Sequence, residues 1–437
     1  MRSGLALEAR QPKWRPLSLL LLAACVVSSW NAVLIGGQQP VDLLIGAALG
    51  LAIVLLLANP GMPVGRIPRW MTIGVWSVIV IVNLNAIANN SLGEIGRGSR
   101  WLVAALVLPW LSVFAAKRDP FLAKSLAKAF VLGVTLSAAV AMSDFFDITS
   151  VNHSLTGVLV NSNGRESGLT THPNNVGLAC AMATPLALYF AERSRWWLAA
   201  IAVLVGGEAV SGSRAGQASL VFAAVVMLSG PLRRSARTRR RVLISVGAIL
   251  VLVLGSSTVR EQFAPVIRIF NRSSTSQSNL AREDHARVAI EAFRDSPVFG
   301  RGMGQATSGH QMELQLLATG GIVLFFGFLI YLLGAAREGF RWSQSGGGMF
   351  ASAVTVAHLA WLAAALFSNA IVDRFLYVPA SIIAIAAAAR QPVAPFKRQA
   401  PSLHEAKSND RGSRFRGVRS VVSPTAFGGH ATEDFPD

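Results

Sequence analysis

Arginine and histidine residues recur in four polar stretches that separate long apolar runs of the sequence. The stretches are NGRESGLTTHPNN with Arg165 and His172, SGSRAG with Arg214, REDHARVAIEAFRDSPVFGRGMG beginning at Arg282, and GHQMELQLLATGG beginning one residue before His310. A planar guanidinium binds two phosphate oxygens at once, and a neutral imidazole can accept a proton near pH 7. Together these groups suit a reaction in which a lipid pyrophosphate leaves and a hydroxyl group attacks.

The composition around these stretches is that of a membrane protein. Of 437 residues, 52% are hydrophobic and 14% are charged, and the mean hydropathy is +0.48. A soluble domain averages about 25% charged residues. The two cysteines, Cys25 and Cys180, lie inside apolar runs, and no acidic metal motif accompanies the arginines. We therefore expect no disulfide, no metal and no other cofactor.

Apolar runs long enough to cross a membrane occupy most of the chain. A helix needs about 20 mainly apolar residues to cross a hydrocarbon core of roughly 30 Å. The runs that meet this length, give or take a few residues at each end, are 17–36, 41–58, 70–88, 101–116, 127–145, 175–191, 196–211, 215–230, 242–257, 314–335, 349–367 and 375–390. The sequence therefore predicts an all-α fold, a polytopic membrane helical bundle of about twelve transmembrane helices.

The basic residues indicate how these spans are oriented. If the N-terminus is cytoplasmic, 28 of the 40 Lys and Arg residues fall on the cytoplasmic side, including the run RRSARTRRR at 233–241. Positive charge near helix ends is retained on that side. We predict that both termini are cytoplasmic, with an N-terminal tail over 1–16, a membrane domain over 17–390 and a disordered basic tail over 391–437. The net charge of +18 then reflects anchors at anionic headgroups rather than nucleic-acid binding.

Two segments on the predicted outer side are longer than a connection needs. They are 146–174, between spans five and six, and 258–313, a large extracytoplasmic loop between spans nine and ten. The larger loop holds seven arginines on the side from which basic residues are normally excluded: Arg260, Arg268, Arg272, Arg282, Arg287, Arg294 and Arg301. His310 lies at the end of this loop, at the outer mouth of the next span. The candidate residues of all four stretches thus gather at one membrane surface.

The four stretches resemble, in the same order, the motifs of the O-antigen ligase and O-antigen polymerase superfamily. The resemblance covers roughly 160–335. It implies a bacterial multi-pass glycosyltransferase of the cytoplasmic (inner) membrane. Such a protein takes a glycan from a polyprenyl pyrophosphate at the outer face and passes it to a glycan or lipid acceptor. It works in the lipid bilayer, beside other membrane proteins of polysaccharide assembly.

The resemblance also assigns roles to individual residues. Arg214 and Arg282 match the pyrophosphate-binding arginines, and His310 matches the residue beside the acceptor hydroxyl. The further candidates for binding pyrophosphate or glycan are Arg165, His172, Asn174, Arg287, Arg301 and Gln311. Two positions depart from the family, because Gln311 stands where Asn is usual and Ala286 where an aromatic residue is frequent. The second departure leaves Arg287 as an alternative to Arg282.

Two carboxylates near these residues are candidates for an orienting role. Glu313 follows His310 by one helical turn, where it either orients the imidazole or faces water. Glu208, in GGEAVSGSR, is expensive inside a span unless it has a partner, so we expect it to pair with Arg214. Structural alternatives stay open for the main candidates: His310 as a helix cap, Arg214 as an anchor in the headgroups, and His172 as the residue that opens a helix before Pro173.

A transporter or flippase for lipid-linked oligosaccharides is the main rival, because such proteins also favour about twelve spans. They place ionisable residues near the bilayer midplane, whereas the span centres here are almost free of charge. A structural scaffold explains the spans but not the external arginines. The glycines at 300, 302 and 304 lack the preceding strand of a dinucleotide-binding loop. A metal-independent glycosyltransferase is the favoured prediction, and the choice between ligase and polymerase stays open.

Overall fold

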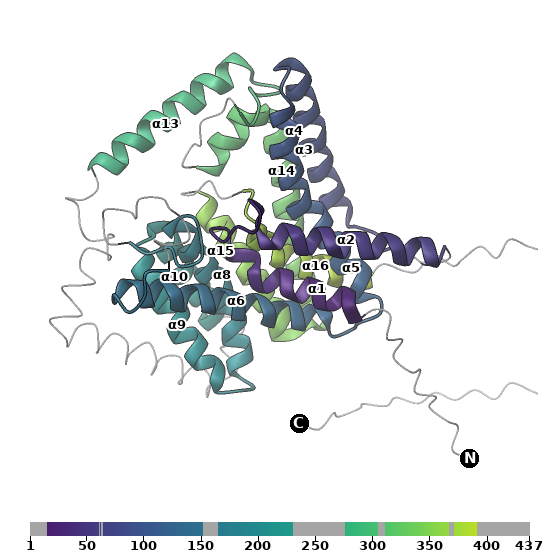
Figure 1. Ribbon diagram of the computed structural model, residues 1–437, viewed down its shortest axis with the longest axis vertical. Coiled ribbons are helices and arrows are strands. Elements are labelled where there is room, and N and C mark those ends of the chain that lie inside the picture. Colours follow the sequence, from purple (N-terminus) through teal and green to yellow (C-terminus); the bar gives the residue numbers. More distant parts are fainter. Residues whose placement is uncertain are drawn as a thin grey trace, which may run out of the picture. The chain divides into compact units, whose positions relative to one another are not determined.

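The computed structural model describes residues 15–60, 62, 64–151, 165–229, 276–304, 311–366 and 371–390. The chain divides into one unit over Met1–Gln391 and another over Pro392–Asp437, and all described residues belong to the first. Helices dominate this unit, and its described residues form no strand beyond an isolated bridge between Ile35 and Gln38 (Figure 1). The predicted span 242–257, the basic run at 233–241 and His310 lie outside the described residues.

The described helices follow one another along the chain. In chain order they are α1 (Arg15–Val26), α2 (Pro40–Ala58), α3 (Arg69–Ala88), α4 (Leu92–Leu102), α5 (Leu108–Ala116), α6 (Leu122–Phe145), α8 (Pro173–Ala191), α9 (Trp196–Ser211), α10 (Arg214–Ser229), α13 (Ser276–Asp295), α14 (Met312–Trp342), α15 (Gly348–Ala365) and α16 (Tyr377–Ala389). Longer segments separate α6 from α8, α10 from α13 and α13 from α14. A π-helical stretch, Val103–Val107, joins α4 to α5.

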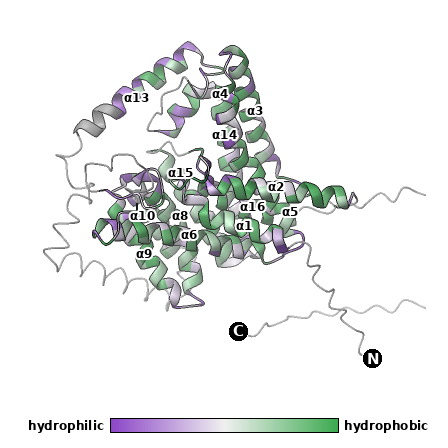
Figure 2. Ribbon diagram, viewed as in Figure 1, coloured by the Kyte–Doolittle hydropathy of each residue, from purple (hydrophilic) through white to green (hydrophobic). Residues whose placement is uncertain are grey.

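Several of these helices are long and apolar enough to cross a membrane. The described residues contain five such helical stretches, Pro40–Ala58, Arg69–Ala88, Leu92–Ala116, Leu122–Phe145 and Met312–Ala365. Shorter apolar helices are Arg15–Ser29, Trp196–Ser211, Arg214–Ser229 and Arg374–Ala389. Hydrophobic residues dominate the helices of the bundle, whereas α13 carries many hydrophilic ones (Figure 2). The chain is thus a helical, multi-pass membrane protein, and the total of about twelve spans stays a prediction.

Each predicted apolar run that falls in the described residues coincides with a helix, but two boundaries were wrong. The run 17–36 is helical only to Ser29, because Ser28 donates a hydrogen bond to the Cys25 carbonyl and the chain then turns away. The buried Ala32 then contacts another connection, where its N–H donates to the Leu169 carbonyl over 3.1 Å, whereas Leu34 and Ile35 are exposed. At 101–116 the helix already begins at Leu92, in a charged stretch that apolarity alone does not reveal.

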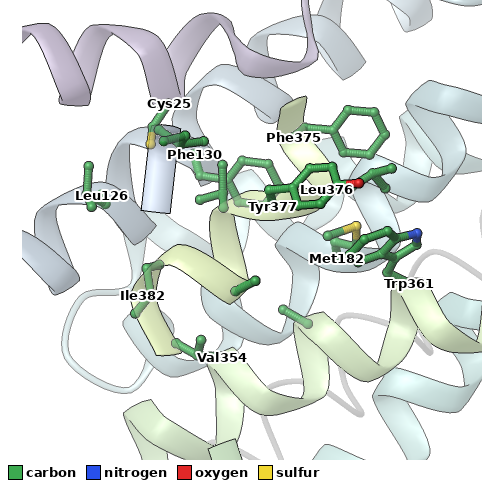
Figure 3. Packing of buried hydrophobic residues seen from close by; sticks show 14 of the residues in the cluster. Cys25, Leu126, Phe130, Met182, Val354, Trp361, Phe375, Leu376, Tyr377 and Ile382 are labelled. Carbon is green, nitrogen blue, oxygen red and sulfur yellow. The ribbon is translucent and has the colours of Figure 1, made fainter. Parts of the chain in front are cut away.

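Helix α8 occupies the centre of the bundle and is buried along almost its whole length. It packs against α6, α9, α10 and α15. Its Met182 belongs to a cluster that joins α8 to Trp361 of α15 and Tyr377 of α16 (Figure 3). In that cluster the Trp361 and Tyr377 rings lie 5.2 Å apart, and Trp101 donates a hydrogen bond to the Tyr377 hydroxyl over 2.6 Å. Four segments far apart in the sequence are therefore held in one core.

Small residues let the neighbours of α8 approach closely. A Cβ atom added to Gly216 of α10 would lie 2.8 Å from the carbonyl carbon of Gly177 in α8. A Cβ added to Gly207 of α9 would lie 2.4 Å from the Cβ of Ala138 in α6. Because lipid tails are as apolar as the side chains, helices in a membrane associate through such close packing.

The connections at one end of the bundle are joined by hydrogen bonds, and we call this end the polar end. It is defined by five residues from four connections or helix ends, namely Asn31, Arg165, Thr171, Ser211 and Asp373. Their backbone and side-chain groups contact one another directly, as described below.

Aromatic rings gather at the other end of the same helices, which we call the aromatic end. The Phe190 and Trp197 rings lie 4.9 Å apart, and Phe350 lies 5.1 Å from Tyr189 and 5.6 Å from Trp342. Tryptophan and tyrosine are enriched at membrane interfaces because one part of each ring system is apolar and another is polar.

The glycine crossing between α8 and α10 predicts how two matched substitutions behave. Gly216→Ala should lower the free energy of unfolding by about 1–3 kcal/mol, because the new methyl group meets the α8 backbone. Gly46→Ala in α2 should leave it unchanged or raise it, because nothing lies within 4 Å of that position. Thermal unfolding of the purified protein in detergent measures both. A Gly216→Ala protein that melts at or above the wild-type temperature would contradict the close crossing.

Candidate functional site

The first and second motifs of the sequence meet at the polar end. The Nε of Arg165 donates to the Ser211 carbonyl over 2.8 Å, and its Nη2 donates to the Asn174 Oδ1 over 2.6 Å. The Glu166 N–H donates to the Val210 carbonyl over 3.2 Å. The stretch that begins with Arg165 is therefore tied both to the start of α8 and to the turn between α9 and α10.

Two helices begin side by side at this place. Helix α8 starts with Pro173, and the His172 Nδ1 accepts a hydrogen bond from the Asn174 N–H, which caps the helix. Helix α10 starts with Arg214, and the Ser213 hydroxyl accepts a hydrogen bond from the Gly216 N–H in the same way. The sequence alternative in which His172 opens a helix is thus confirmed as its structural role.

The electrostatic arrangement at the start of α8 and α10 is unusual. Each helix N-terminus carries the equivalent of about half a positive charge, so acidic residues are favoured there. Neither helix has an acidic residue in its first turn. Instead Arg165 is bound at the start of α8, and the half-exposed Arg214 is the first residue of α10. Two guanidinium groups and two helix N-termini therefore lie at one part of the polar end, beside the buried carboxyl groups of Glu166 and Glu208.

The expected ion pair between Glu208 and Arg214 was wrong, because the structure forms none between these two described residues. The Glu208 side chain is 4% exposed and lies at the glycine crossing, with its Oε1 3.1 Å from the position of an added Gly216 Cβ. That Oε1 has no hydrogen-bond partner among the described residues. Glu208 thus packs between α8, α9 and α10, whereas Arg214 is half-buried as the first residue of α10.

A second polar cluster at this end was missed by the sequence analysis. The Asn31 Oδ1 accepts from the Thr171 N–H over 2.7 Å, and its Nδ2 donates to the Asp373 Oδ1 over 2.8 Å. Arg374, which is 4% exposed, donates from Nε to Asp42 over 2.8 Å and from Nη2 to the second oxygen of the same carboxylate. Burial raises the pKa of the Asp373 carboxyl, which the Asn31 hydrogen bond and the Arg374 charge partly oppose.

A signal for this cluster does exist in the sequence. Asp42 lies in an apolar run, and Asp373 and Arg374 directly precede another one. Charged residues in such places are expensive without a partner, which indicates that these residues find one another.

The third and fourth motifs meet around a break in α14. Gly321 has φ +61° and ψ −159°, which divides α14 into a short first piece and a long second piece. The backbone of Pro297–Gly302 fills the break: the Ile322 N–H donates to the Pro297 carbonyl over 2.9 Å, and the Arg301 N–H donates to the Ala318 carbonyl over 2.9 Å. Non-helical backbone at membrane depth is tolerated where protein groups satisfy it in this way.

The candidate residues of α14 and of the segment before it differ in their surroundings. Arg301 is about half exposed and forms an ion pair with Asp295 at 2.9 Å. Gln311 is exposed and precedes the first residue of α14, and Glu313 is half-buried in its first turn. An orienting contact between Glu313 and His310 stays a prediction.

Helix α13 carries both candidates for the functional loop arginine. Arg287 is exposed and forms an ion pair with Asp284 at 3.1 Å within the helix. Arg282 is half-buried, and it is seven residues before Ala289, which places both on the same helix face. Ala289 packs on Ala318 in the first piece of α14. Arg282 therefore lies on the face of α13 that is turned to α14, and this favours it over Arg287.

The candidates thus form two groups rather than one. Arg165, His172, Asn174 and Arg214 are brought together at the start of α8 and α10. The second group surrounds α13 and the first piece of α14: Arg282, Arg287, Arg301, Gln311 and Glu313. Helix α15 packs against α8 and α10 and also against the second piece of α14, where Trp361 meets Phe328. The described residues contain no cluster of three or more His, Cys, Asp or Glu side chains that could hold a metal.

Comparison with known proteins identifies the region that holds most of these residues. Residues 197–329 match the family model described as O-antigen ligase. No curated protein matches the chain. The matched region includes Arg214, Arg282 and the break in α14 and is similar to the O-antigen ligase family, so the resemblance seen in the sequence motifs is confirmed.

The hydrogen bonds of Asn31 generate a prediction about the stability of the polar end. Asn31→Leu should lower the free energy of unfolding by about 1–3 kcal/mol, because the Thr171 N–H and the buried Asp373 carboxyl would both lose their partner. Asn83→Leu is the matched control, since the exposed Asn83 side chain bonds only the Ile79 carbonyl of its own helix. Thermal unfolding in detergent compares the two proteins. Equal melting temperatures would show that the Asn31 contacts contribute nothing.

Proposed function

We propose that the protein is a membrane glycosyltransferase of surface polysaccharide assembly. It transfers a glycan from a polyprenyl pyrophosphate to an acceptor hydroxyl at the outer face of the bacterial cytoplasmic membrane. The observation that carries this proposal is the concentration of positive charge at the adjoining starts of α8 and α10. It is supported by the match of residues 197–329 to the O-antigen ligase family.

The pyrophosphate of the donor fits the charge at these two helix starts. A helix N-terminus offers free N–H groups and a positive dipole to phosphate oxygens. Arg214 adds a guanidinium, which keeps its charge at any relevant pH and binds phosphate in two places. Arg165 is fixed beside it by Ser211 and Asn174, so little side-chain entropy is lost when an anion binds.

In the proposed reaction the bond between the anomeric carbon and the phosphate oxygen breaks, and a new bond forms from that carbon to the acceptor oxygen. The leaving pyrophosphate takes the electron pair, and Arg214 at the start of α10 stabilises its charge. His310 accepts the proton of the acceptor hydroxyl. The arginines thereby supply the charge stabilisation for which many transferases use a divalent metal.

The contacts between connections support an orientation with the polar end on the outer side. The contacts of the polar end join the segments around Asn31, Thr171, Ser211 and Asp373, which the positive charge distribution places on the outer side. On the aromatic end, Arg390 forms an ion pair with Glu338 at 3.0 Å, and both belong to segments assigned to the cytoplasm. The contacts therefore support alternating spans with cytoplasmic termini.

A ligase acting on a lipid or surface acceptor is the favoured form of this activity, because the matched family model is described as O-antigen ligase. A polymerase would use the same donor site and would differ in the acceptor that reaches His310.

The donor site predicts a difference between two arginines in equivalent helix positions. Arg214 and Arg69 are the first residues of α10 and α3. Arg69, however, lies at the cytoplasmic side in the predicted orientation. Arg214→Ala should weaken binding of geranylgeranyl diphosphate by about 10–100-fold, the loss expected for one charged hydrogen-bond partner. Arg69→Ala should bind as the wild type does. Calorimetry on the full chain in nanodiscs measures both, with and without a chelator.

Chelation is expected to leave the affinity of the wild-type protein unchanged. The donor site would have to be placed elsewhere if Arg214→Ala bound the diphosphate as tightly as Arg69→Ala does.

The orientation can be tested with a second matched pair. Gln38 and Gln344 are both exposed, the first at the polar end and the second near the aromatic end. A Gln38→Cys protein should react in intact cells with a maleimide that does not cross membranes, and a Gln344→Cys protein should react only after lysis. The native Cys25 and Cys180 are buried and give little background. The opposite labelling pattern would refute an external donor site.

A further inference from the structure

Glu94, in the first turn of α4, binds backbone that lies more than two hundred residues later in the chain. Its Oε2 accepts from the Met303 N–H over 2.7 Å, and its Oε1 accepts from the Gly304 N–H over 2.7 Å. Arg97, one turn further along α4, donates from Nη2 to Oε1 over 3.2 Å. The Glu94 residue is 1% exposed. Both carboxylate oxygens are thus used in a buried site.

Two neighbouring asparagines hold the same segment from α3 and the turn that follows it. The Asn85 Nδ2 donates to the Phe299 carbonyl over 3.1 Å, and the Asn89 Nδ2 donates to the Arg301 carbonyl over 3.1 Å. The segment's own N–H groups bond α14, since the Gly302 N–H donates to the Thr319 carbonyl over 2.9 Å. We call residues 297–304, held between α3, α4 and the break in α14, the anchored segment.

The glycines of the anchored segment are required by this contact. Gly302 has φ +92°, and an added Cβ would lie 2.9 Å from the Asn89 Nδ2 and 3.1 Å from the Glu94 carboxylate. A Cβ added to Gly304 would lie 2.2 Å from the Arg97 Nη2 and 2.7 Å from the Glu94 Oε1. The repeated glycines that look like a nucleotide loop in the sequence therefore allow the backbone to reach a carboxylate.

The anchored segment carries Arg301 and leads towards the start of α14, where Gln311 and Glu313 lie. Glu94 fixes the end of this segment at Gly304, and the pairing with Ala318 and Thr319 fixes it against the first piece of α14. The anchored segment and the first residues of α14, which carry the acceptor-side candidates, are consequently held in one geometry. The donor site at α8 and α10 shares none of these contacts.

We propose that Glu94 is a positioning residue for the acceptor side of the site. It holds the anchored segment against the break in α14. Arg301 in that segment and Gln311 and Glu313 at the start of α14 then face the acceptor in a single arrangement. This inference rests on the proposed glycosyl transfer, but the anchor itself can be measured without any turnover.

Glu94→Gln tests the hydrogen bonds that the Glu94 carboxylate accepts from Met303 and Gly304. A glutamine side chain has nearly the same shape, but it offers one oxygen instead of two and turns an NH2 group towards an N–H donor. Amide exchange at Met303 and Gly304 should become roughly tenfold faster or more, as expected for the loss of a charged hydrogen bond. Hydrogen–deuterium exchange on the purified full chain measures this directly.

Turnover should change in a way that a general loss of structure would not produce. Misplacement of reacting groups by about 1 Å costs up to about 100-fold in rate. With polyprenyl-diphosphate glycans extracted from the host membranes, kcat of Glu94→Gln should fall about 10–100-fold while KM for this donor stays near the wild-type value. If kcat fell and the KM for the donor changed by the same factor, the positioning role would be refuted.

Glu338→Gln is the matched control, because Glu338 also pairs with an arginine three residues later, Arg341 at 2.9 Å, but it lies near the aromatic end. It should change neither exchange at Met303 nor kcat. Gly304→Ala leaves Glu94 in place and should reproduce both effects of Glu94→Gln, which covers the case in which that variant does not fold.

The outcomes are distinguishable. Unchanged exchange at Met303 and Gly304 in Glu94→Gln would refute the anchor, and faster exchange with normal kcat would refute its role in positioning. A wild-type protein without turnover of the lipid-linked glycan would instead count against the proposed function, while the exchange experiment still decides the anchor.

Discussion

The close approach of backbones around α8 is the constraint on which the rest of the structure depends. A helix surrounded by other helices in a bilayer gains nothing from the hydrophobic effect between them, so its stability comes from packing and interhelical contacts. Gly177 and Gly216 bring α8 and α10 together, and Gly207 brings α9 against α6. As a result the turn of Ser211, Gly212 and Ser213 is pressed against the first turn of α8. A bulkier crossing would separate the two helix starts and disperse the positive charge that they concentrate.

Polar groups inside this bundle are satisfied by partners that are distant in the chain. Glu94 binds the backbone of Met303 and Gly304, and Arg374 binds Asp42. An unpaired charge in such surroundings costs several kcal/mol, so each contact selects one arrangement of the connections over its competitors. Glu208 is the contrast, since one of its oxygens lacks a hydrogen-bond partner in the described residues although it is nearly fully buried. We have no physical account of its position beyond the packing it takes part in.

Apolar periodicity and length were enough to predict the apolar helices of the described residues, because the bilayer imposes a span length that hydropathy records. They did not predict α13, a hydrophilic helix inside the segment 258–313 that was expected to be a loop. They also failed at the edges, where Trp30 to Gly36 leaves the helix and Leu92 to Arg100 extends one, since tertiary contacts decide those boundaries. The sequence also predicted that Arg165 and Arg214 belong to one surface, because both flank apolar runs on the same predicted side. It could not predict that Asn174 and Ser211 hold Arg165, nor that Glu94 meets Gly304. Such contacts depend on how helices pack, and one sequence does not contain the distances between them.

The predicted pairing of Glu208 with Arg214 was wrong for a similar reason. The two residues are six positions apart along the chain, and the left-handed turn at Gly212 separates them.

Helix α15 packs against α8 and α10 and also against α14. Its contacts with α14 include His358 with the Leu332 carbonyl and Trp361 with the Phe328 ring, both in the second piece of that helix. Many residues of α15 are alanines, whose small side chains let the neighbouring helices approach it closely. Enlarging those alanines would change the spacing between α8, α10 and α14 without altering a single charged group.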